Sequence, residues 1–198
     1  MKQPRKLQSK LQGIIFDLDG TLANTHLDFP QMCLDANLPV GTKILEYCDS
    51  INDKELVCQI LSIVERHELA GANNAEWILD AKETLRRLYK AKIPMAIVTR
   101  NMRAAAQLTI SKLGIPIELV ITREDCQPKP SPEGLLMVAK LWDIKPQQLI
   151  YVGDYKFDLI AANNAGMISC LLLNDQNSEF VSMADEVIEK FQQLERLF

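Results

Sequence analysis

The chain has 198 residues, 47% of them hydrophobic, which suffices for one substantial core and a small insert but not for two full domains. A net charge of −4 argues against nucleic acid or a membrane surface as partner, and no apolar run is long enough to cross a bilayer. The five cysteines form no Cys-x-x-Cys pair, so we expect free thiols and a cytoplasmic protein.

The N-terminal segment is basic, with Lys2, Arg5, Lys6 and Lys10 before the first apolar run. We expect residues 1–10 to form a mobile tail. The alternative is an arm that docks electrostatically on a partner.

Two carboxylates follow the first predicted strand. The run Ile14-Ile-Phe after Gly13 is typical of a strand buried on both faces, and Asp17 and Asp19 come directly after it. At ~4 Å and an effective dielectric constant of ~20, two such charges repel by about 4 kcal/mol. A bound cation or a proton held on one carboxyl group would relieve this repulsion. Oxygen ligands beside a phosphate suit Mg²⁺, whereas a polar turn after a core strand is the alternative.

The next stretch, residues 24–79, shows no convincing strand. Helical spacing predicts short helices near 30–37 and 42–49, and a longer one that Asp53 caps and Gly71 ends. We interpret this stretch as a helical cap inserted into a core made of residues 1–23 and 80–198. It could simply pack on that core, or it could act as a lid that excludes water.

From Asp80 onward, helical and strand patterns alternate, which predicts a doubly wound parallel sheet, that is, a Rossmann-like α/β core. The helices are expected at 80–90, 103–113 (capped by Asn101), 132–142 and 157–165, the strands at 94–99, 118–122, 149–153 and 168–173, and a short edge strand with a terminal helix at 186–198.

Further polar groups fall at or near the ends of these strands, where open α/β sheets bind ligands. Thr99 ends one strand and Arg100 follows it, Lys129 lies between two prolines, and Asp154 and Asp158 follow another strand. Each has an ordinary explanation: a threonine that caps a helix, a lysine on a loop, or acids that favour a helix N-terminus.

Taken in order, these residues resemble the motifs of the haloacid dehalogenase superfamily of phosphohydrolases. The matching stretches are Asp17-x-Asp19-Gly-Thr, Thr99, Lys129 and Gly153-Asp154-x-x-x-Asp158. Ile97-Val-Thr-Arg-Asn and Lys129-Pro-Ser-Pro-Glu-Gly also look like the phosphoglycolate-phosphatase-like branch, which carries a helical cap after the first motif, although the insert here is short for that branch.

The resemblance implies a reaction at the first motif. Asp17 would be the nucleophile and Asp19 the general acid and base. A Mg²⁺ ion would be held by Asp17, the backbone carbonyl of Asp19 and Asp154.

The resemblance also implies how the phosphoryl group is held. Thr99 and Lys129 would stabilise its charge, with Thr21 and Arg100 also binding substrate. Asp158 would orient metal-bound water or Lys129.

The resemblance therefore implies a Mg²⁺-dependent phosphatase that hydrolyses a small phosphate monoester through an aspartyl-phosphate. Its partner would be a small phosphorylated metabolite, with no nucleic acid and no membrane, and the protein would be a monomer or dimer. A phosphosugar mutase using the same chemistry remains an alternative, although the short cap argues against it. A phospho-acceptor or binding protein without activity is a further alternative. Dehalogenase chemistry is disfavoured because Asp19 and Gly20 match the phosphatase form of the motif.

Overall fold

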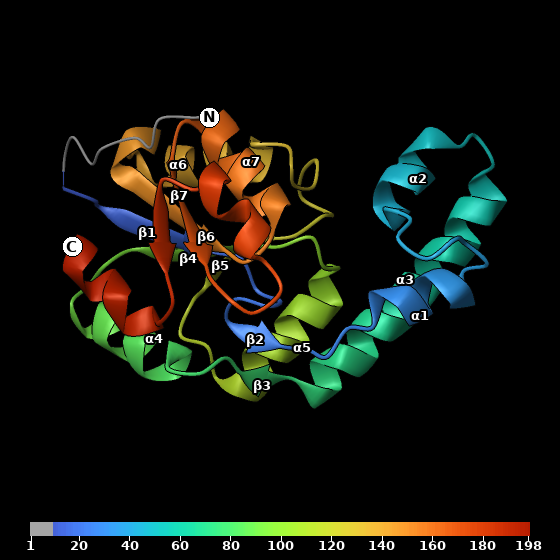
Figure 1. Ribbon diagram of the computed structural model, residues 1–198, viewed down its shortest axis with the longest axis horizontal. Coiled ribbons are helices and arrows are strands. Elements are labelled where there is room, and N and C mark those ends of the chain that lie inside the picture. Colours follow the sequence, from blue (N-terminus) through green and yellow to red (C-terminus); the bar gives the residue numbers. More distant parts are fainter. Residues whose placement is uncertain (1–9) are drawn as a thin grey trace.

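The computed structural model describes residues 10–198, and its centre is a six-stranded parallel sheet (Figure 1). The strands, in spatial order, are β5 (Leu119–Ile121), β4 (Met95–Val98), β1 (Gly13–Phe16), β6 (Leu149–Gly153), β7 (Ile168–Leu172) and β8 (Glu186–Ile188). After β1, the chain adds β4 and β5 on one side of that strand, and it then crosses over to add β6, β7 and β8 on the other side. The strand order therefore reverses beside β1, which is where such sheets bind ligands.

Helices cover both faces of this sheet, as the α/β prediction requires. They are α4 (Ala81–Lys90), α5 (Arg103–Leu113), α6 (Glu133–Trp142), α7 (Lys156–Ala165) and the 3₁₀ helices η1 (Pro146–Gln148), η2 (Ser178–Met183) and η3 (Phe191–Leu197). Ile14 and Phe16 of β1 enter the apolar cluster shared with α4 and η3, whereas Ile15 enters the one shared with α6 and α7. Since side chains alternate along a strand, β1 is buried on both faces, and the predicted doubly wound sheet is confirmed.

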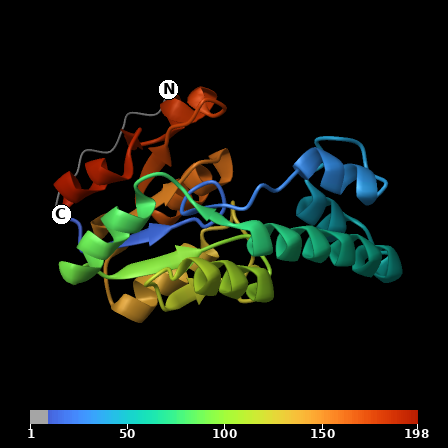
Figure 2. The ribbon, with the colours of Figure 1, turned by 90° about the horizontal axis from the view of Figure 1, so that it is seen from below.

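Residues 25–75, called here the helical insert, project away from the sheet (Figures 1 and 2). The insert contains α1 (Phe29–Asp35), α2 (Ile44–Ser50) and α3 (Lys54–Asn74). These helices bury an apolar cluster of their own, which includes Met32, Ile44, Ile60 and Val64. A helical unit with its own core needs little support from the sheet except at its base.

The base of the insert is a two-stranded antiparallel ribbon. Ala23–Asn24 forms β2 and Glu76–Trp77 forms β3, with Ala23 opposite Trp77. The expectation that residues 24–79 contain no strand is therefore wrong at these positions. Two residues are too few to produce an alternating pattern, so pairing is decided by the tertiary structure.

The long helix α3 begins as expected but ends later. Asp53 accepts hydrogen bonds from the backbone N–H groups of Glu55 and Leu56, so its predicted capping role is confirmed. The prediction that Gly71 ends the helix is wrong, because α3 continues to Asn74. A Cβ at position 71 would lie 2.7 Å from the carbonyl oxygen of Thr25. This glycine instead lets the helix approach the chain that leaves the core.

An ion pair also joins the insert to the core near the C-terminal end of α3. Glu68 is buried, and its Oε1 lies 2.5 Å from Nη1 of Arg123. Its second oxygen accepts a hydrogen bond from the backbone N–H of Met102, just before α5. Arg123 also donates to the carbonyl oxygen of Arg100. Both carboxylate oxygens thus tie α3 to the core.

We expect Glu68→Gln to lower the free energy of unfolding by about 3 kcal/mol, because it leaves the guanidinium of Arg123 without its charge partner in a buried place. Urea denaturation measures this change. Glu65→Gln, about one turn away on α3, is the matched control and should change stability by less than about 0.5 kcal/mol. Equal effects of the two variants would show that the ion pair does not anchor the insert.

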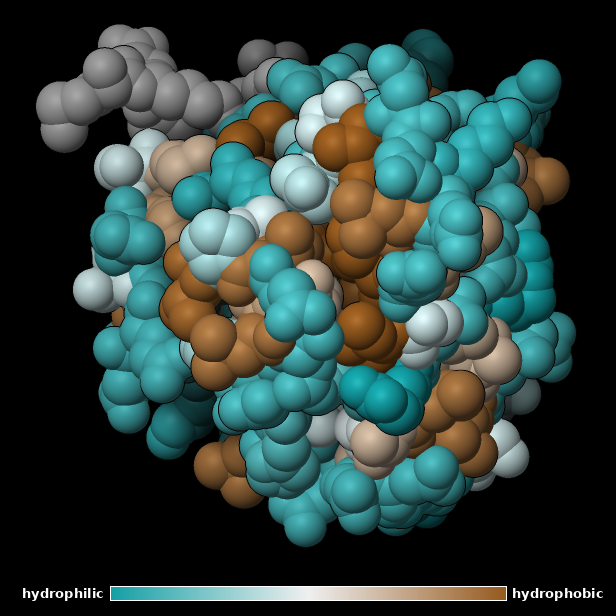
Figure 3. Space-filling view, turned by 90° about the vertical axis from the view of Figure 1, so that its right-hand side faces the viewer, coloured by the Kyte–Doolittle hydropathy of each residue, from teal (hydrophilic) through white to brown (hydrophobic). Residues whose placement is uncertain are grey.

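At the end of the molecule formed by the insert, apolar and hydrophilic side chains are interspersed (Figure 3). The exposed large apolar residues of the insert are Phe29, Leu34, Val40 and Leu56. Phe29 and Leu34 lie on α1, Leu56 lies on α3, and Val40 lies on the loop between α1 and α2. Scattered exposed apolar residues of this kind are common on protein surfaces.

Three expectations from composition concern the whole chain. All five cysteines are free thiols, as predicted. Within residues 10–198, no helix combines the length and the apolar character needed to cross a membrane. The predicted basic tail, residues 1–10, falls almost entirely outside the described residues.

Candidate active site

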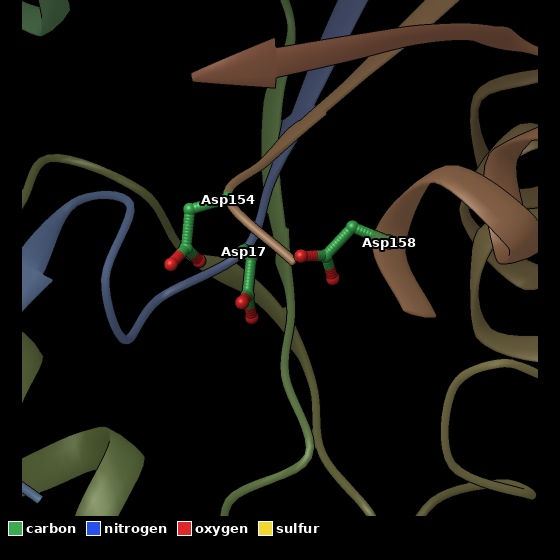
Figure 4. Close-up of side chains that lie close together, drawn as sticks. All are labelled: Asp17, Asp154 and Asp158. Carbon is green, nitrogen blue, oxygen red and sulfur yellow. The ribbon is translucent and has the colours of Figure 1, made fainter. Parts of the chain in front are cut away.

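The polar groups singled out in the sequence meet at the carboxyl edge of the sheet. Asp17, Thr99 and Asp154 directly follow β1, β4 and β6, and these three strands are neighbours. Lys129 arrives from the loop between β5 and α6, and Asp158 from the first turn of α7. Figure 4 shows the carboxyl group of Asp17 between those of Asp154 and Asp158.

Lys129 is the cation at the centre of this cluster. Its Nζ lies 2.7 Å from an oxygen of Asp17 and 2.7 Å from an oxygen of Asp158, and only 4% of the residue is exposed. It also donates to the hydroxyl oxygen of Tyr151 at 2.7 Å. Burial alone would lower the pKa of Lys129, but the carboxylates of Asp158 and Asp17 more than compensate and raise it. The ammonium group therefore stays charged.

Tyr151, which was not predicted as a site residue, helps to position Lys129. Tyr151 lies in β6, is fully buried, and donates its hydroxyl hydrogen to the carbonyl oxygen of Val98 at 2.8 Å. With that hydrogen committed, its oxygen can only accept from Lys129. Tyr151 could have been recognised because its hydroxyl is the one polar side-chain group in this apolar strand. A buried tyrosine hydroxyl needs a hydrogen-bond partner.

The three acids carry more negative charge than Lys129 balances. One oxygen from each of Asp17, Asp154 and Asp158 lies within 4.8 Å of the others. Burial raises the pKa of Asp17 well above its usual range, against the opposing effect of Lys129. Burial, and next the charge of Asp158, raise the pKa of Asp154 to about 7. Without a further cation, protons would have to offset the excess charge.

Asp19 lies on the other side of the same turn, with partners of its own. Its Oδ1 accepts a hydrogen bond from the hydroxyl of Thr25 at 2.5 Å, and the side chain of Asn101 also bonds to it. Burial nevertheless raises the pKa of Asp19. The prediction that Asn101 caps α5 is wrong, because Met102 holds the cap position. The amide side chain bonds instead to the acid of the first motif.

Gly20 and Thr21 shape the turn between the two acids and Asp154. Gly20 has φ of +75°, and a Cβ there would lie 2.4 Å from Oδ2 of Asp154. Only glycine allows this turn and this close approach. The hydroxyl of Thr21 donates to Oδ1 of Asp154 at 3.3 Å. Thr21 thus contacts the acid cluster.

Thr99 lies at the end of β4, the strand beside β1, whereas Arg100 contacts the insert. Thr99 is buried, and its hydroxyl oxygen accepts from the backbone N–H of Asn101 at 3.1 Å, which leaves the hydroxyl hydrogen available to a ligand. Arg100 instead binds the carboxylate of Glu46 on α2 and the carbonyl oxygen of Lys129. The predicted role of Arg100 in substrate binding would require it to exchange this partner.

The donor set fits a divalent cation with hard-ligand preferences. Asp17 uses one oxygen for Lys129, and Asp154 uses one for Thr21. Each keeps a second carboxylate oxygen, and the excess negative charge of the cluster favours a divalent ion. Asp158 accepts from both Lys129 and the backbone N–H of Tyr155, so it is already well satisfied. Asp17 and Asp154 are therefore the best side-chain ligands.

The fold and the site together define a hydrolase with a Rossmann-like core and paired carboxylates at the tip of its central strand. Residues 14–172 match the family model for haloacid dehalogenase-like hydrolases, and the chain belongs to this family. Enzymes of this family generally use a divalent metal, which agrees with the acid cluster.

Curated relatives span most of the chain at modest identity. A haloacid dehalogenase-like hydrolase domain-containing protein of Arabidopsis thaliana is 29% identical over 83% of this chain and 72% of its own length. Pyrophosphatase PpaX of Bacillus thuringiensis is also 29% identical, over 79% of this chain and 81% of its own.

Solved structures share the fold. A haloacid dehalogenase-like hydrolase from Bacteroides fragilis has a TM-score of 0.79 at 20% identity and covers 93% of this chain and 100% of its own. A protein described as a predicted phosphoglycolate phosphatase from Haemophilus somnus has a TM-score of 0.72 at 21% identity, over 96% and 99% of the two chains.

Proposed function

We propose that this protein is a Mg²⁺-dependent phosphatase that hydrolyses a small phosphate monoester through an aspartyl-phosphate on Asp17. The observation that carries the proposal is the position of Lys129, whose ammonium lies 2.7 Å from Asp17 among three carboxylates at the carboxyl edge of the sheet. A fixed cation beside a nucleophilic carboxylate is what binding a phosphoryl group requires. A relative named as a pyrophosphatase supports a phosphate compound as substrate, and a protein with the same fold is described as a predicted phosphoglycolate phosphatase.

The metal would be held by the free oxygens of Asp17 and Asp154 and by the backbone carbonyl of Asp19. When bound, Mg²⁺ supplies positive charge that neutralises the phosphoryl oxygens and keeps Asp17 ionised. Asp158 retains Lys129 and acts on the site through it.

Two carboxyl groups divide the chemistry. A carboxylate oxygen of Asp17 attacks phosphorus in line, and the bond from phosphorus to the ester oxygen breaks. Protonated Asp19 gives its proton to that departing oxygen. Ionised Asp19 then takes a proton from water, whose oxygen attacks phosphorus and displaces Asp17. The burial that raises the pKa of Asp19 suits a group that must first donate a proton.

Neutral and cationic donors hold the phosphoryl group during both steps. Lys129 offers the point charge, and Thr99 offers its hydroxyl hydrogen. Thr21 holds Asp154 in place by donating its hydroxyl hydrogen to it, and it would have to release Asp154 to bind substrate directly. The helical insert, as the cap of a core made of residues 1–23 and 80–198, would close over these groups and exclude bulk water.

Phosphate release from a panel of phosphometabolites tests the function. We expect turnover with Mg²⁺, and loss of at least about 100-fold after removal of the metal with EDTA, because Asp17 and Asp154 then lose the charge that keeps them ionised. Added Mg²⁺ should restore the rate. Isomer formation without phosphate release would identify a mutase instead, and no turnover of any compound would refute the proposal.

We expect Mg²⁺ affinity to rise with pH between about pH 5.5 and pH 7. The pKa of Asp154 is about 7 without metal, so below that pH the ion must displace a proton, and affinity falls by up to about tenfold per pH unit. The pKa of Asp154 is higher in the folded protein than its unfolded value of 3.8, so the folded state favours the protonated carboxyl group. The free energy of unfolding of the metal-free protein therefore falls as pH rises between about 4 and 7.

Titration calorimetry at pH 5.5, 6.5, 7.5 and 8.5 measures this affinity, and thermal melts in EDTA measure the stability. Asp143→Asn, at the exposed C-cap of α6, is the control and should follow the wild-type profile. Affinity that stays constant from pH 5.5 to 7.5 would contradict the assignment of Asp154 as a ligand.

A further inference from the structure

Three cations from separate segments meet around Phe157, the residue before Asp158. Cζ of Arg100 lies 4.8 Å from the centre of the ring, and Nζ of Lys43, at the start of α2, lies 5.2 Å from it. Nζ of Lys156 lies 5.9 Å from the same ring. One aromatic ring at the boundary between core and insert thus gathers three positive charges.

These charges are only partly balanced. Within the described part of the chain, Glu46 is the only acid that forms an ion pair with any of the three cations. Its two oxygens bind the two terminal nitrogens of Arg100, at 2.9 and 3.0 Å, in a forked pair. Three positive charges and one negative charge leave an excess of two, which attracts a further anion.

The cluster lies next to the phosphoryl-binding groups. Arg100 follows Thr99 in the chain and donates to the carbonyl oxygen of Lys129, whose ammonium contacts Asp17. The guanidinium of Arg100 is therefore separated from that ammonium by roughly the length of one lysine residue. A phosphate ester of a few carbon atoms spans such a separation.

We propose that Arg100, Lys43 and Lys156 bind a second anionic group of the substrate, a carboxylate or a second phosphate, and that Glu46 occupies Arg100 until this group replaces it. The inference rests on the proposed phosphatase function and narrows its substrates to small phosphate esters with a negative charge at the far end. Phe157 would pack against the carbon chain between the two charged ends. Because Lys43 belongs to the insert, binding would also hold the insert against the core.

Two matched pairs of substrates test the subsite. Ethyl phosphate is compared with 2-phosphoglycolate, which replaces its methyl group by a carboxylate. Propyl phosphate is compared with 1,3-propanediol bisphosphate, which adds a second phosphate. We expect kcat/KM to be at least about tenfold higher for the doubly anionic member of one or both pairs, and the larger ratio identifies the group that is bound.

Variants show whether the cluster is responsible. The specificity ratio is kcat/KM for the doubly anionic ester divided by kcat/KM for the simple ester of the same pair. Arg100→Met should lower this ratio at least about tenfold for the preferred pair, and Lys43→Met should lower it about threefold or more. Glu46→Gln should raise the ratio, because the competing charge on Arg100 is lost. Lys140→Met, an exposed lysine on α6 distant from the site in sequence and structure, is the control and should leave the ratio unchanged.

The outcomes separate the two proposals. If wild-type protein hydrolyses the simple esters but prefers neither doubly anionic partner, the subsite is wrong and the phosphatase function stands. If Arg100→Met and Glu46→Gln change kcat/KM equally for both members of each pair, the ion pair between Arg100 and Glu46 only holds the insert against the core. The subsite is then again wrong. If none of the four esters and no other phosphate compound is hydrolysed, the phosphatase function itself fails.

Discussion

Asp17→Asn is expected to lower kcat at least about 1,000-fold with Mg²⁺ present, because an amide cannot attack phosphorus to form the covalent intermediate. Loss of a covalent nucleophile should cost several kcal/mol of transition-state stabilisation, and each factor of ten corresponds to about 1.4 kcal/mol. Asparagine has nearly the same size, and Lys129 keeps its contact with Asp158 at 2.7 Å. The fold should therefore survive, and the loss should appear in kcat rather than in expression or melting temperature.

Steady-state phosphate release from the best substrate measures this loss. Asp143→Asn makes the same chemical change at the exposed C-cap of α6 and should retain wild-type kcat. If Asp17→Asn kept more than about a hundredth of the wild-type rate, another residue would have to be the nucleophile.

Lys129→Met is expected to remove activity and also to change how stability depends on pH. The side chains have similar length, but the thioether cannot offset the charges of Asp17 and Asp158, which both lie 2.7 Å from the ammonium. We expect kcat/KM to fall at least about 100-fold, because the phosphoryl group loses its fixed cation. In EDTA the free energy of unfolding should fall by about 3 kcal/mol at pH 8, since two buried carboxylates lose their partner.

The pH dependence distinguishes this role from simple packing. At pH 5, protons can neutralise the acid cluster, so the stability loss of Lys129→Met should be clearly smaller than at pH 8. A loss that is equal at both pH values would mean that Lys129 acts mainly through packing. Lys140→Met supplies the control for removal of a lysine charge from an exposed position. Activity above about a tenth of wild type would contradict the phosphoryl-binding role.

The groups at the strand ends could be predicted because each directly follows a recognisable apolar strand. Asp17 and Asp154 come immediately after β1 and β6, so a parallel sheet was enough to bring them together. Lys129 had no such support, since it lies in a loop, and only its resemblance to a known motif placed it near Asp17. Its actual distance, 2.7 Å, depends on the fold of the whole loop.

The supporting contacts could not be predicted, because they join residues far apart in sequence through side chains that look ordinary. In the sequence, little distinguishes Tyr151 from the other residues of a buried strand, or Glu68 from the other acids of a helix. The pairing of Glu68 with Arg123 spans 55 residues and depends on how α3 lies against the segment after β5. Gly71 has a structural role, but a glycine near a helix end can either end the helix or allow a close contact with another segment.

The ribbon formed by β2 and β3 brings the two ends of the helical insert side by side, with Asn24 opposite Glu76 and Ala23 opposite Trp77. A segment that enters and leaves at one point can lengthen, shorten or be exchanged between related proteins without moving the strands on either side of it. About fifty residues can therefore vary during evolution while the acids, the lysine and the sheet that carries them stay fixed.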